Sequence, residues 1–150
     1  MLIGKETSVL RSLSLAAAVL LGSAAIANGI YMLATPESWY FTVPGVTTTG
    51  PFNQHFVRDI GIVFLFLGGS FLFGAARPDL RVALWAAPSI WLSGHALFHF
   101  WEVAAGICGP SAIARDFPAV TLPAIVGLAI TVWAIFQARP ASAVQAERMT

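Results

Sequence analysis

Apolar residues occur along the chain in four long blocks, separated by short stretches that are polar or contain proline and glycine. The blocks cover about residues 13–34, 56–76, 82–104 and 119–137. Each has roughly the 20 residues that a helix needs to cross a bilayer. We therefore predict an all-α protein, a four-helix transmembrane bundle formed by one integral membrane domain, with a polar tail at 139–150.

The breaks between the blocks support this division. The longest break, residues 35–54, contains several prolines and glycines, and its Trp39, Tyr40 and Phe41 are suited to the headgroup level of a membrane. The first block follows a short leader with Lys5 and Arg11, so it is either a retained span or a signal peptide cleaved after Ala27. The apolar run continues beyond Ala27, which favours a retained span.

The composition agrees with a membrane location. The chain is 57% hydrophobic and 10% charged, whereas soluble domains have about 25% charged residues. Its mean hydropathy is +0.78. We therefore expect a lipid bilayer around the helices. A net charge of +1 without a basic cluster argues against nucleic acid as a partner, and the single cysteine excludes an internal disulfide.

The positions of the basic residues predict the orientation. Two lie on or near one side of a four-span arrangement, Arg58 and Arg115, and the others lie on the opposite side: Lys5, Arg11, Arg77, Arg81, Arg139 and Arg148. By the positive-inside rule, both termini are then cytoplasmic. We expect a bacterial inner (plasma) membrane, and a homo-oligomer or a membrane partner subunit is compatible with the lipid-facing surface of four helices.

The third block carries ionisable residues at helical spacing. His95, His99 and Glu102 follow one another at i, i+4 and i+7, within an arc of about 60° on a helix. Antiparallel pairing with the second block, at about 1.5 Å per residue, sets His55 opposite Glu102 or Val103 and Asp59 opposite His99. Ionisable groups at membrane depth are costly and usually functional. We therefore expect these residues to form one layer in the outer leaflet.

Imidazoles and carboxylates together are common ligands of transition metals. The working hypothesis is a site for zinc, iron, copper or manganese, with further polar residues around it that orient the ligands or line its mouth. The predicted ligands are His55, Asp59, His95, His99 and Glu102, and the surrounding residues are Asn28, Tyr31, Asn53, Arg58 and Trp91.

Other interpretations of the same residues stay open. They can form a buried polar network that fixes helix register without an ion. They can serve as acid and base in a pocket for a lipid, quinone or sterol-like molecule, lined by Trp85, Trp91, Phe98 and Trp101. Haem ligation by two histidines and a proton path are further alternatives. The leading hypothesis is a membrane metalloprotein, with an oxidoreductase or a hydrolase as the enzyme classes it would include. The alternative is a non-catalytic subunit or a lipid- or quinone-binding protein. Whether it is an enzyme is not decided by the sequence.

Two motifs resemble those of a known group. A Pro-Gly-Val turn at residues 44–46 precedes Asn53, His55, Phe56, Arg58 and Asp59, and a His-x-x-x-His helix follows at His95 and His99. This pattern resembles a group of small, uncharacterised bacterial four-span membrane proteins, and the layout is distantly similar to DoxX-like proteins. The resemblance covers roughly residues 13–137. It implies a fold and a location, and it supplies no activity.

Overall fold

The computed structural model describes residues 2–138, and the side chains of residues 8–138. Within that range the chain is helical and contains no strand. The elements are α1 (Leu2–Ala34), α2 (Pro36–Thr42), the 3-10 turn η1 (Val46–Thr48), α3 (Gln54–Ala76), α4 (Arg81–Ala104), α5 (Ser111–Asp116), the π-helical turn η2 (Phe117–Thr121) and α6 (Leu122–Ala138).

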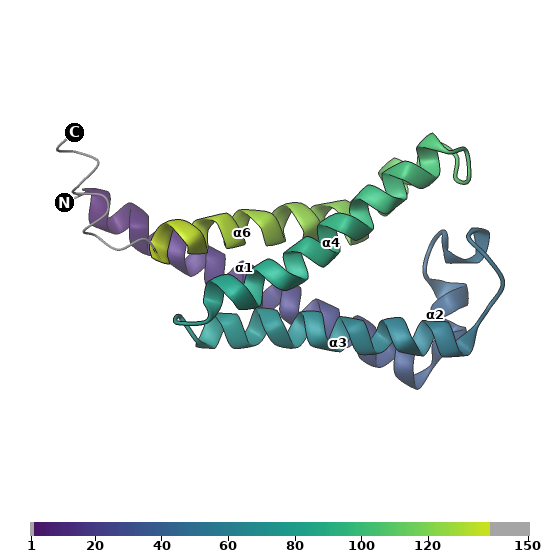
Figure 1. Ribbon diagram of the computed structural model, residues 1–150, viewed down its shortest axis with the longest axis horizontal. Coiled ribbons are helices and arrows are strands. Elements are labelled where there is room, and N and C mark those ends of the chain that lie inside the picture. Colours follow the sequence, from purple (N-terminus) through teal and green to yellow (C-terminus); the bar gives the residue numbers. More distant parts are fainter. Residues whose placement is uncertain (1, 139–150) are drawn as a thin grey trace.

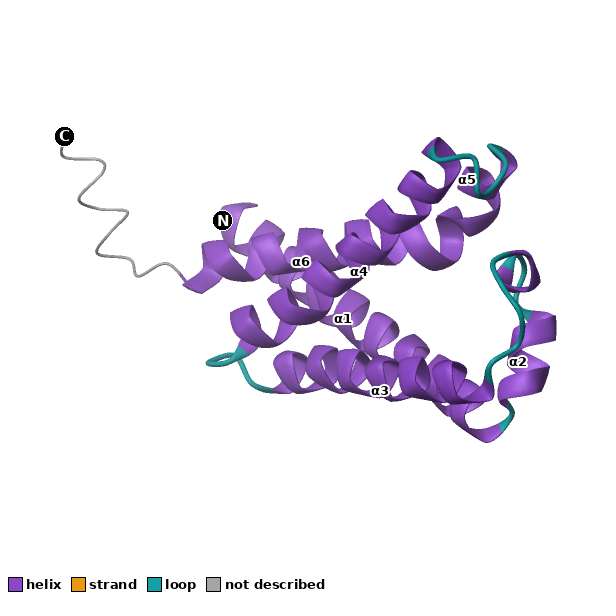
Figure 2. Ribbon diagram, turned by 45° about the vertical axis from the view of Figure 1, so that its right-hand side comes forward, coloured by secondary structure: helices purple, strands orange, loops and turns teal. Residues whose placement is uncertain are grey.

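The four long helices form two pairs that diverge from a common end (Figure 1). Helix α1 packs along α3, and α4 packs along α6. The pairs meet at what we call the closed end, beside the turn between α3 and α4, and separate toward the open end, which carries α2 on one pair and α5 on the other (Figure 2). The start of α1 and the end of α6 both lie at the closed end (Figure 1).

Glycines let α1 and α3 approach until their backbones touch. A Cβ on Gly22 would lie 2.9 Å from the Gly68 carbonyl oxygen, and one on Gly68 would lie 2.6 Å from the Gly22 carbonyl oxygen. Gly29 and Gly61 face each other in the same way, at 2.7 and 3.1 Å. The spacing is seven residues in both helices, so two contacts two turns apart hold this antiparallel pair together.

At the closed end, side chains of α4 hold this helix against α3 by donating hydrogen bonds to backbone carbonyls of α3. The buried Arg81 guanidinium donates from Nε to the Gly74 carbonyl oxygen at 2.9 Å and from Nη2 to the Ala75 carbonyl oxygen at 3.0 Å. The fully buried Trp85 donates from Nε1 to the Phe71 carbonyl oxygen at 3.0 Å. Arg81 therefore satisfies carbonyls that α3 leaves unpaired at its C-terminus.

The α4–α6 pair is joined by a hydroxyl contact. Ser89 Oγ and Thr131 Oγ1, both buried, lie 3.1 Å apart. Gly127 on α6 makes room for Ser89, since a Cβ there would lie 2.8 Å from the Ser89 hydroxyl oxygen. Each long helix therefore has its own partner beyond the closed end, which is why the two pairs can separate.

Several predictions from the pattern are confirmed. The four predicted blocks correspond to α1, α3, α4 and α6. Among the described residues, three segments are long and apolar enough to cross a membrane: Ser8–Ala34, Gln54–Ala76 and Ser111–Ala138. These identify a membrane protein by length and composition. Helix α4 is not among them, because Pro88, two serines, two histidines and the charged residues near its ends lower its hydropathy. A fourth span, cytoplasmic termini and closure into one bundle therefore stay predictions, and the tail at 139–150 lies outside the described residues.

The loops contain more helix than the pattern indicated. The break at residues 35–54 includes α2 and η1, and α5 precedes the fourth block. Tyr40 fixes this segment by donating from its hydroxyl to the Gly50 carbonyl oxygen at 2.5 Å. The last helical segment begins at Ser111, so Asp116 lies inside it, and the Asp116 side chain caps no backbone N–H.

Candidate functional site: a histidine and aspartate cluster on the α4–α6 pair

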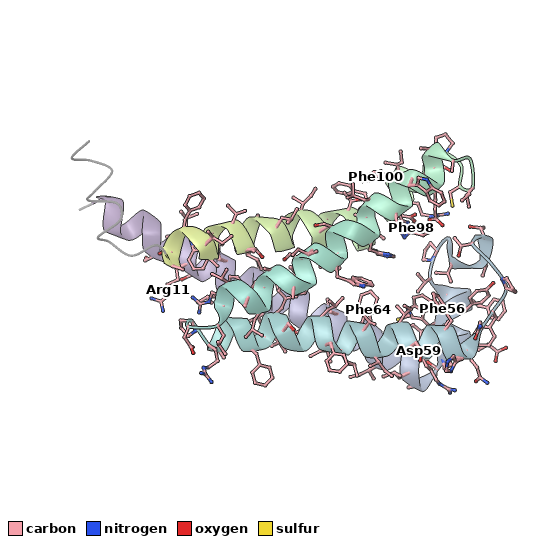
Figure 3. The ribbon with its side chains drawn as sticks, in the orientation of Figure 1. Arg11, Phe56, Asp59, Phe64, Phe98 and Phe100 are labelled. Carbon is pink, nitrogen blue, oxygen red and sulfur yellow. The ribbon has the colours of Figure 1, made fainter. Side chains whose placement is uncertain are left out.

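The structure separates the predicted ligands into two groups. His55 and Asp59 lie in the first turns of α3, whereas His95, His99 and Glu102 lie in the last turns of α4. Because α3 and α4 diverge toward the open end, the expected layer of five residues is not formed (Figure 3). Within the part of the chain that the structure describes, no group of three or more His, Cys, Asp and Glu side chains is placed to hold a metal ion.

The best-connected member of the second group is His99. Its Nδ1 lies 3.0 Å from Oδ2 of Asp116, at the end of α5. Arg115 donates to the same carboxylate twice, from Nε to Oδ1 at 2.6 Å and from Nη2 to Oδ2 at 2.9 Å. The His99 side chain is 27% exposed and that of Asp116 12%. We call His95, His99, Arg115 and Asp116 the histidine cluster.

The hydrogen bond fixes the role of each His99 nitrogen. An ionised carboxylate only accepts hydrogen bonds, so Nδ1 of His99 must carry the proton that it shares with Asp116. In the neutral imidazole, Nε2 is then the acceptor. No hydrogen bond to Nε2 is formed by the residues whose side chains are described. His99 thus has one nitrogen held by the protein and one available to a ligand.

His95 extends the cluster along α4 as part of a ladder of rings. Its ring meets that of His99 edge-on, with centroids 4.7 Å apart, and stacks on Trp91 with centroids 5.1 Å apart. Trp91 in turn meets Phe64 of α3 edge-on at 5.6 Å. Figure 3 shows Phe64 on the side of α3 that faces α4. The ladder therefore runs from the junction of the two pairs to the histidine cluster.

An irregular turn places Asp116 beside α4. Residues Phe117–Thr121 form a π-helical turn, and the Leu122 N–H bonds to the Phe117 carbonyl five residues back. Pro118 lies within this turn and Pro123 follows shortly after it; neither supplies an N–H, so the regular α-helical ladder cannot continue through this stretch. Such wide turns occur often at functional sites. Behind His99 and Asp116 lies a cavity of only about 10 Å³, no more than one water needs.

The residues predicted to surround the site have mainly structural partners on the other pair. Asn28 accepts a hydrogen bond from Trp39 Nε1 at 2.9 Å, and the Tyr31 hydroxyl lies 3.0 Å from Ser38 Oγ. Both contacts hold α2 against α1. Near the start of α3, the Asn53 side chain accepts from two backbone N–H groups, and Arg58 donates to the Leu33 carbonyl at the end of α1 and to Gln54.

Among the described residues, the remaining predicted ligands form no hydrogen bond or ion pair with the histidine cluster. His55 Nε2 and Asp59 Oδ2 are 3.3 Å apart, but their side chains are 85% and 56% exposed. Glu102 is buried, with 8% exposure, and its backbone carbonyl accepts from the N–H groups of Ile107 and Cys108. Its carboxylate forms no hydrogen bond or ion pair with the side chains that the structure describes.

One contact joins the two pairs at the open end. The Arg115 guanidinium lies over Gly45, so close that a Cβ there would be 2.5 Å from Nη2. Gly45 has φ of 87°, a left-handed conformation that favours glycine. Sequence reasoning missed the parts played by Arg115 and Asp116. The available signal was an adjacent acid and base before two prolines, and its distance from His99 in the chain concealed the contact.

The described residues do not fit a complete metal centre. Zinc sites in proteins take three or four protein ligands, and the structure offers two adjacent imidazoles whose nearest carboxylate is already bonded to His99 Nδ1 and Arg115. Metal binding at the five predicted residues stays a prediction.

Comparison of the chain with family models, curated proteins and solved structures gave no match. The resemblance to small four-span bacterial proteins is therefore untested.

Proposed function

We propose that this membrane protein binds a lipophilic molecule through a hydroxyl head group, such as a quinol or a sterol-like alcohol. The observation that carries the proposal is the hydrogen bond between His99 and Asp116, which makes Nε2 of a partly exposed imidazole an acceptor. A ligand hydroxyl is the matching donor. Within a bilayer such a molecule can reach the protein from the surrounding lipid.

The surroundings of His99 fit an apolar body attached to that head group. Phe100 and Ile113, which line the small cavity beside His99, are 40% and 45% exposed. Sites for small molecules are mostly apolar, with a few placed polar groups that set orientation. The 10 Å³ cavity behind His99 is too small for an organic molecule, so the ligand has to approach the exposed side of the ring.

The role of each charged group follows from its contacts. Asp116 orients the His99 ring and stabilises positive charge on it if the ligand hydroxyl gives up its proton. Arg115 neutralises Asp116 through two hydrogen bonds, so that the carboxylate does not need a further cation. Asp116 and Arg115 are therefore positioning residues, and His99 is the residue that would contact the ligand.

The test is a binding titration of the purified protein in detergent with decylubiquinol and, separately, decylubiquinone, followed by tryptophan fluorescence. The quinol should bind saturably and more tightly than the quinone, because only the quinol donates a hydrogen bond. His99→Gln should weaken quinol binding about tenfold, the effect of losing one hydrogen bond of about 1.4 kcal/mol. His55→Gln, on the other helix pair, is the matched control and should leave affinity unchanged.

Two outcomes would overturn the proposal. One is equal loss of affinity in both variants, or no saturable binding at all. The other is stoichiometric transition metal in the purified protein that disappears in a His95→Ala/His99→Ala double variant. That second result would favour the metal hypothesis instead, and elemental analysis by mass spectrometry detects it directly.

A further inference from the structure

A hollow lies where the short helix α2 packs on the open end of the α1–α3 pair (Figure 2). We call it the α2 hollow. Its volume is about 390 Å³, within the range of about 300–1,000 Å³ that is typical of ligand sites. Its lining combines apolar and polar side chains, among them Pro36, Glu37, Ser38, Phe52, Gln54 and Arg58.

Hydrogen bonds hold both walls of the α2 hollow in place. On the α2 side, Ser38 Oγ lies 3.0 Å from the Tyr31 hydroxyl of α1. On the α3 side, the Arg58 guanidinium donates from Nε to the Leu33 carbonyl oxygen at 3.3 Å and from Nη1 to Gln54 Oε1 at 3.1 Å. The polar groups around the hollow are therefore positioned before any ligand binds.

Two opposite charges line the α2 hollow without pairing. Glu37 and Arg58 are both exposed, and no ion pair joins them. A guanidinium carries five N–H groups, and the contacts with Leu33 and Gln54 use two of them, so three remain. The Glu37 carboxylate forms no hydrogen bond within the part of the chain whose side chains are described. The hollow thus offers charged donors and charged acceptors at separate positions.

From this arrangement we infer that the α2 hollow binds the phosphoethanolamine head group of a phospholipid, with the phosphate on Arg58 and the ammonium on Glu37. Guanidinium groups match phosphate oxygens with paired hydrogen bonds, and a primary ammonium has three N–H donors for a carboxylate. The hollow lies where the apolar segment Ser8–Ala34 ends and Gln54–Ala76 begins. Lipid head groups occupy this depth, at the ends of apolar spans. The site is independent of the histidine cluster, which lies on the other helix pair.

The test is native mass spectrometry of the detergent-purified chain with added phosphatidylethanolamine, phosphatidylcholine or phosphatidylglycerol. The unaltered chain should retain phosphatidylethanolamine best, because the choline ammonium donates no hydrogen bond and phosphatidylglycerol has no positive charge. Glu37→Gln should weaken retention of phosphatidylethanolamine about fivefold, near the upper limit for an exposed charge pair, and should not weaken that of phosphatidylglycerol. Arg58→Gln removes the phosphate contact and should weaken retention of both lipids.

Asp59→Asn is the matched control. Asp59 is another exposed carboxylate near the start of α3, but it does not line the α2 hollow, so this change should leave the preference for phosphatidylethanolamine intact. Because Glu37 has no hydrogen bond to lose among the described residues, Glu37→Gln should fold normally, and thermal unfolding in detergent verifies this.

Three outcomes would overturn the inference. Equal losses in Glu37→Gln and Asp59→Asn would show a response to overall charge. Equal retention of phosphatidylethanolamine and phosphatidylcholine by the unaltered chain would remove the role of the ammonium. If soluble phosphoethanolamine at the same concentration displaces the lipid, the ligand is the free compound and the assignment to a phospholipid is wrong.

Discussion

The two ends of this molecule use polar side chains in opposite ways. At the closed end, Arg81 and Trp85 reach from α4 to backbone carbonyls of α3, and each contact crosses between helix pairs. At the open end, the hydrogen bond between His99 and Asp116 stays on the side of the α4–α6 pair. The hydrogen bond between Asn28 and Trp39 stays on the side of the α1–α3 pair. The contact of Arg115 with Gly45 is the exception.

The polar contacts at the closed end are suited to stabilising the fold, whereas those at the open end are suited to binding. Away from water, backbone and side-chain polar groups must find partners within the protein. The closed-end side chains meet that need with fixed carbonyls. At the open end, His99 uses one nitrogen for Asp116 and keeps the other, so this end has a hydrogen-bonding group to offer a ligand. Variants at the closed end should therefore change stability, and variants of the histidine cluster should change binding.

The largest effect is expected from Gly74→Ala at the closed end. The added methyl would lie 2.5 Å from Cδ1 and Nε1 of the fully buried Trp85, so α3 and α4 must move apart. We expect a loss of about 2–3 kcal/mol in unfolding free energy, typical of overpacking. Thermal unfolding in detergent measures it.

Gly69→Ala is the control for that variant. Gly69 lies in the same helix, and no atom comes within 4 Å of the added methyl. The change should be neutral or stabilising by up to about 1 kcal/mol, because alanine favours helix. Similar losses in both variants would contradict the close contact between α3 and α4.

A smaller effect is expected from the pair of His99 and Asp116. In a double-mutant cycle with His99→Gln and Asp116→Asn, we expect a coupling of about 1 kcal/mol, since the hydrogen bond involves a charged group but the ring is partly exposed. Chemical unfolding in detergent measures each corner of the cycle. Additive effects of the two substitutions would mean that the imidazole does not depend on Asp116, and the proposed binding role of Nε2 would lose its support.

The hydroxyl contact between α4 and α6 should contribute less. Ser89→Ala and Thr131→Val each remove one partner of a buried hydrogen bond. Interhelical hydrogen bonds in membranes average about 0.6 kcal/mol by double-mutant cycles, and we expect a coupling of that size. The same unfolding experiment applies. A coupling above about 2 kcal/mol would place this contact among the main supports of the fold.

The hydrophobic pattern predicted the long helices well because spans are decided locally, by runs of apolar residues between prolines, glycines and charges. The predicted end of the second block at residue 76 coincides with the end of α3, where Arg77 and Pro78 follow. The site was harder to predict. Counting residues along two antiparallel helices correctly puts His55 and Glu102 at the same end of the molecule. Two residues at the same height on α3 and α4 are not neighbours, however, when the two helices diverge.

The distance between α3 and α4 depends on how all four long helices pack, and the sequence of one helix alone does not determine it. Gly22 and Gly68 allow close packing of α1 on α3, and Gly127 allows close packing of α6 on Ser89 of α4. Helices α3 and α4 therefore pack against each other at the closed end and separate toward the open end. Asp116 was missed for a related reason. Its contact with His99 depends on the π-helical turn after it, and the sequence signal there, two prolines five residues apart, marks an irregularity without its direction.

The smallest coupling is expected between His55 and Asp59, which both lie on α3. Their geometry resembles that of His99 and Asp116, with atoms 3.3 Å apart, yet the side chains are 85% and 56% exposed. Exposed pairs at i, i+4 contribute about 0.3–0.5 kcal/mol, so a cycle of His55→Gln and Asp59→Asn should give a coupling in that range. A coupling above 1 kcal/mol, as large as that of His99 and Asp116, would mean that the pair is buried in the bilayer. The two helix pairs would then approach each other at the open end, and the metal hypothesis that unites all three histidines would regain its geometric basis.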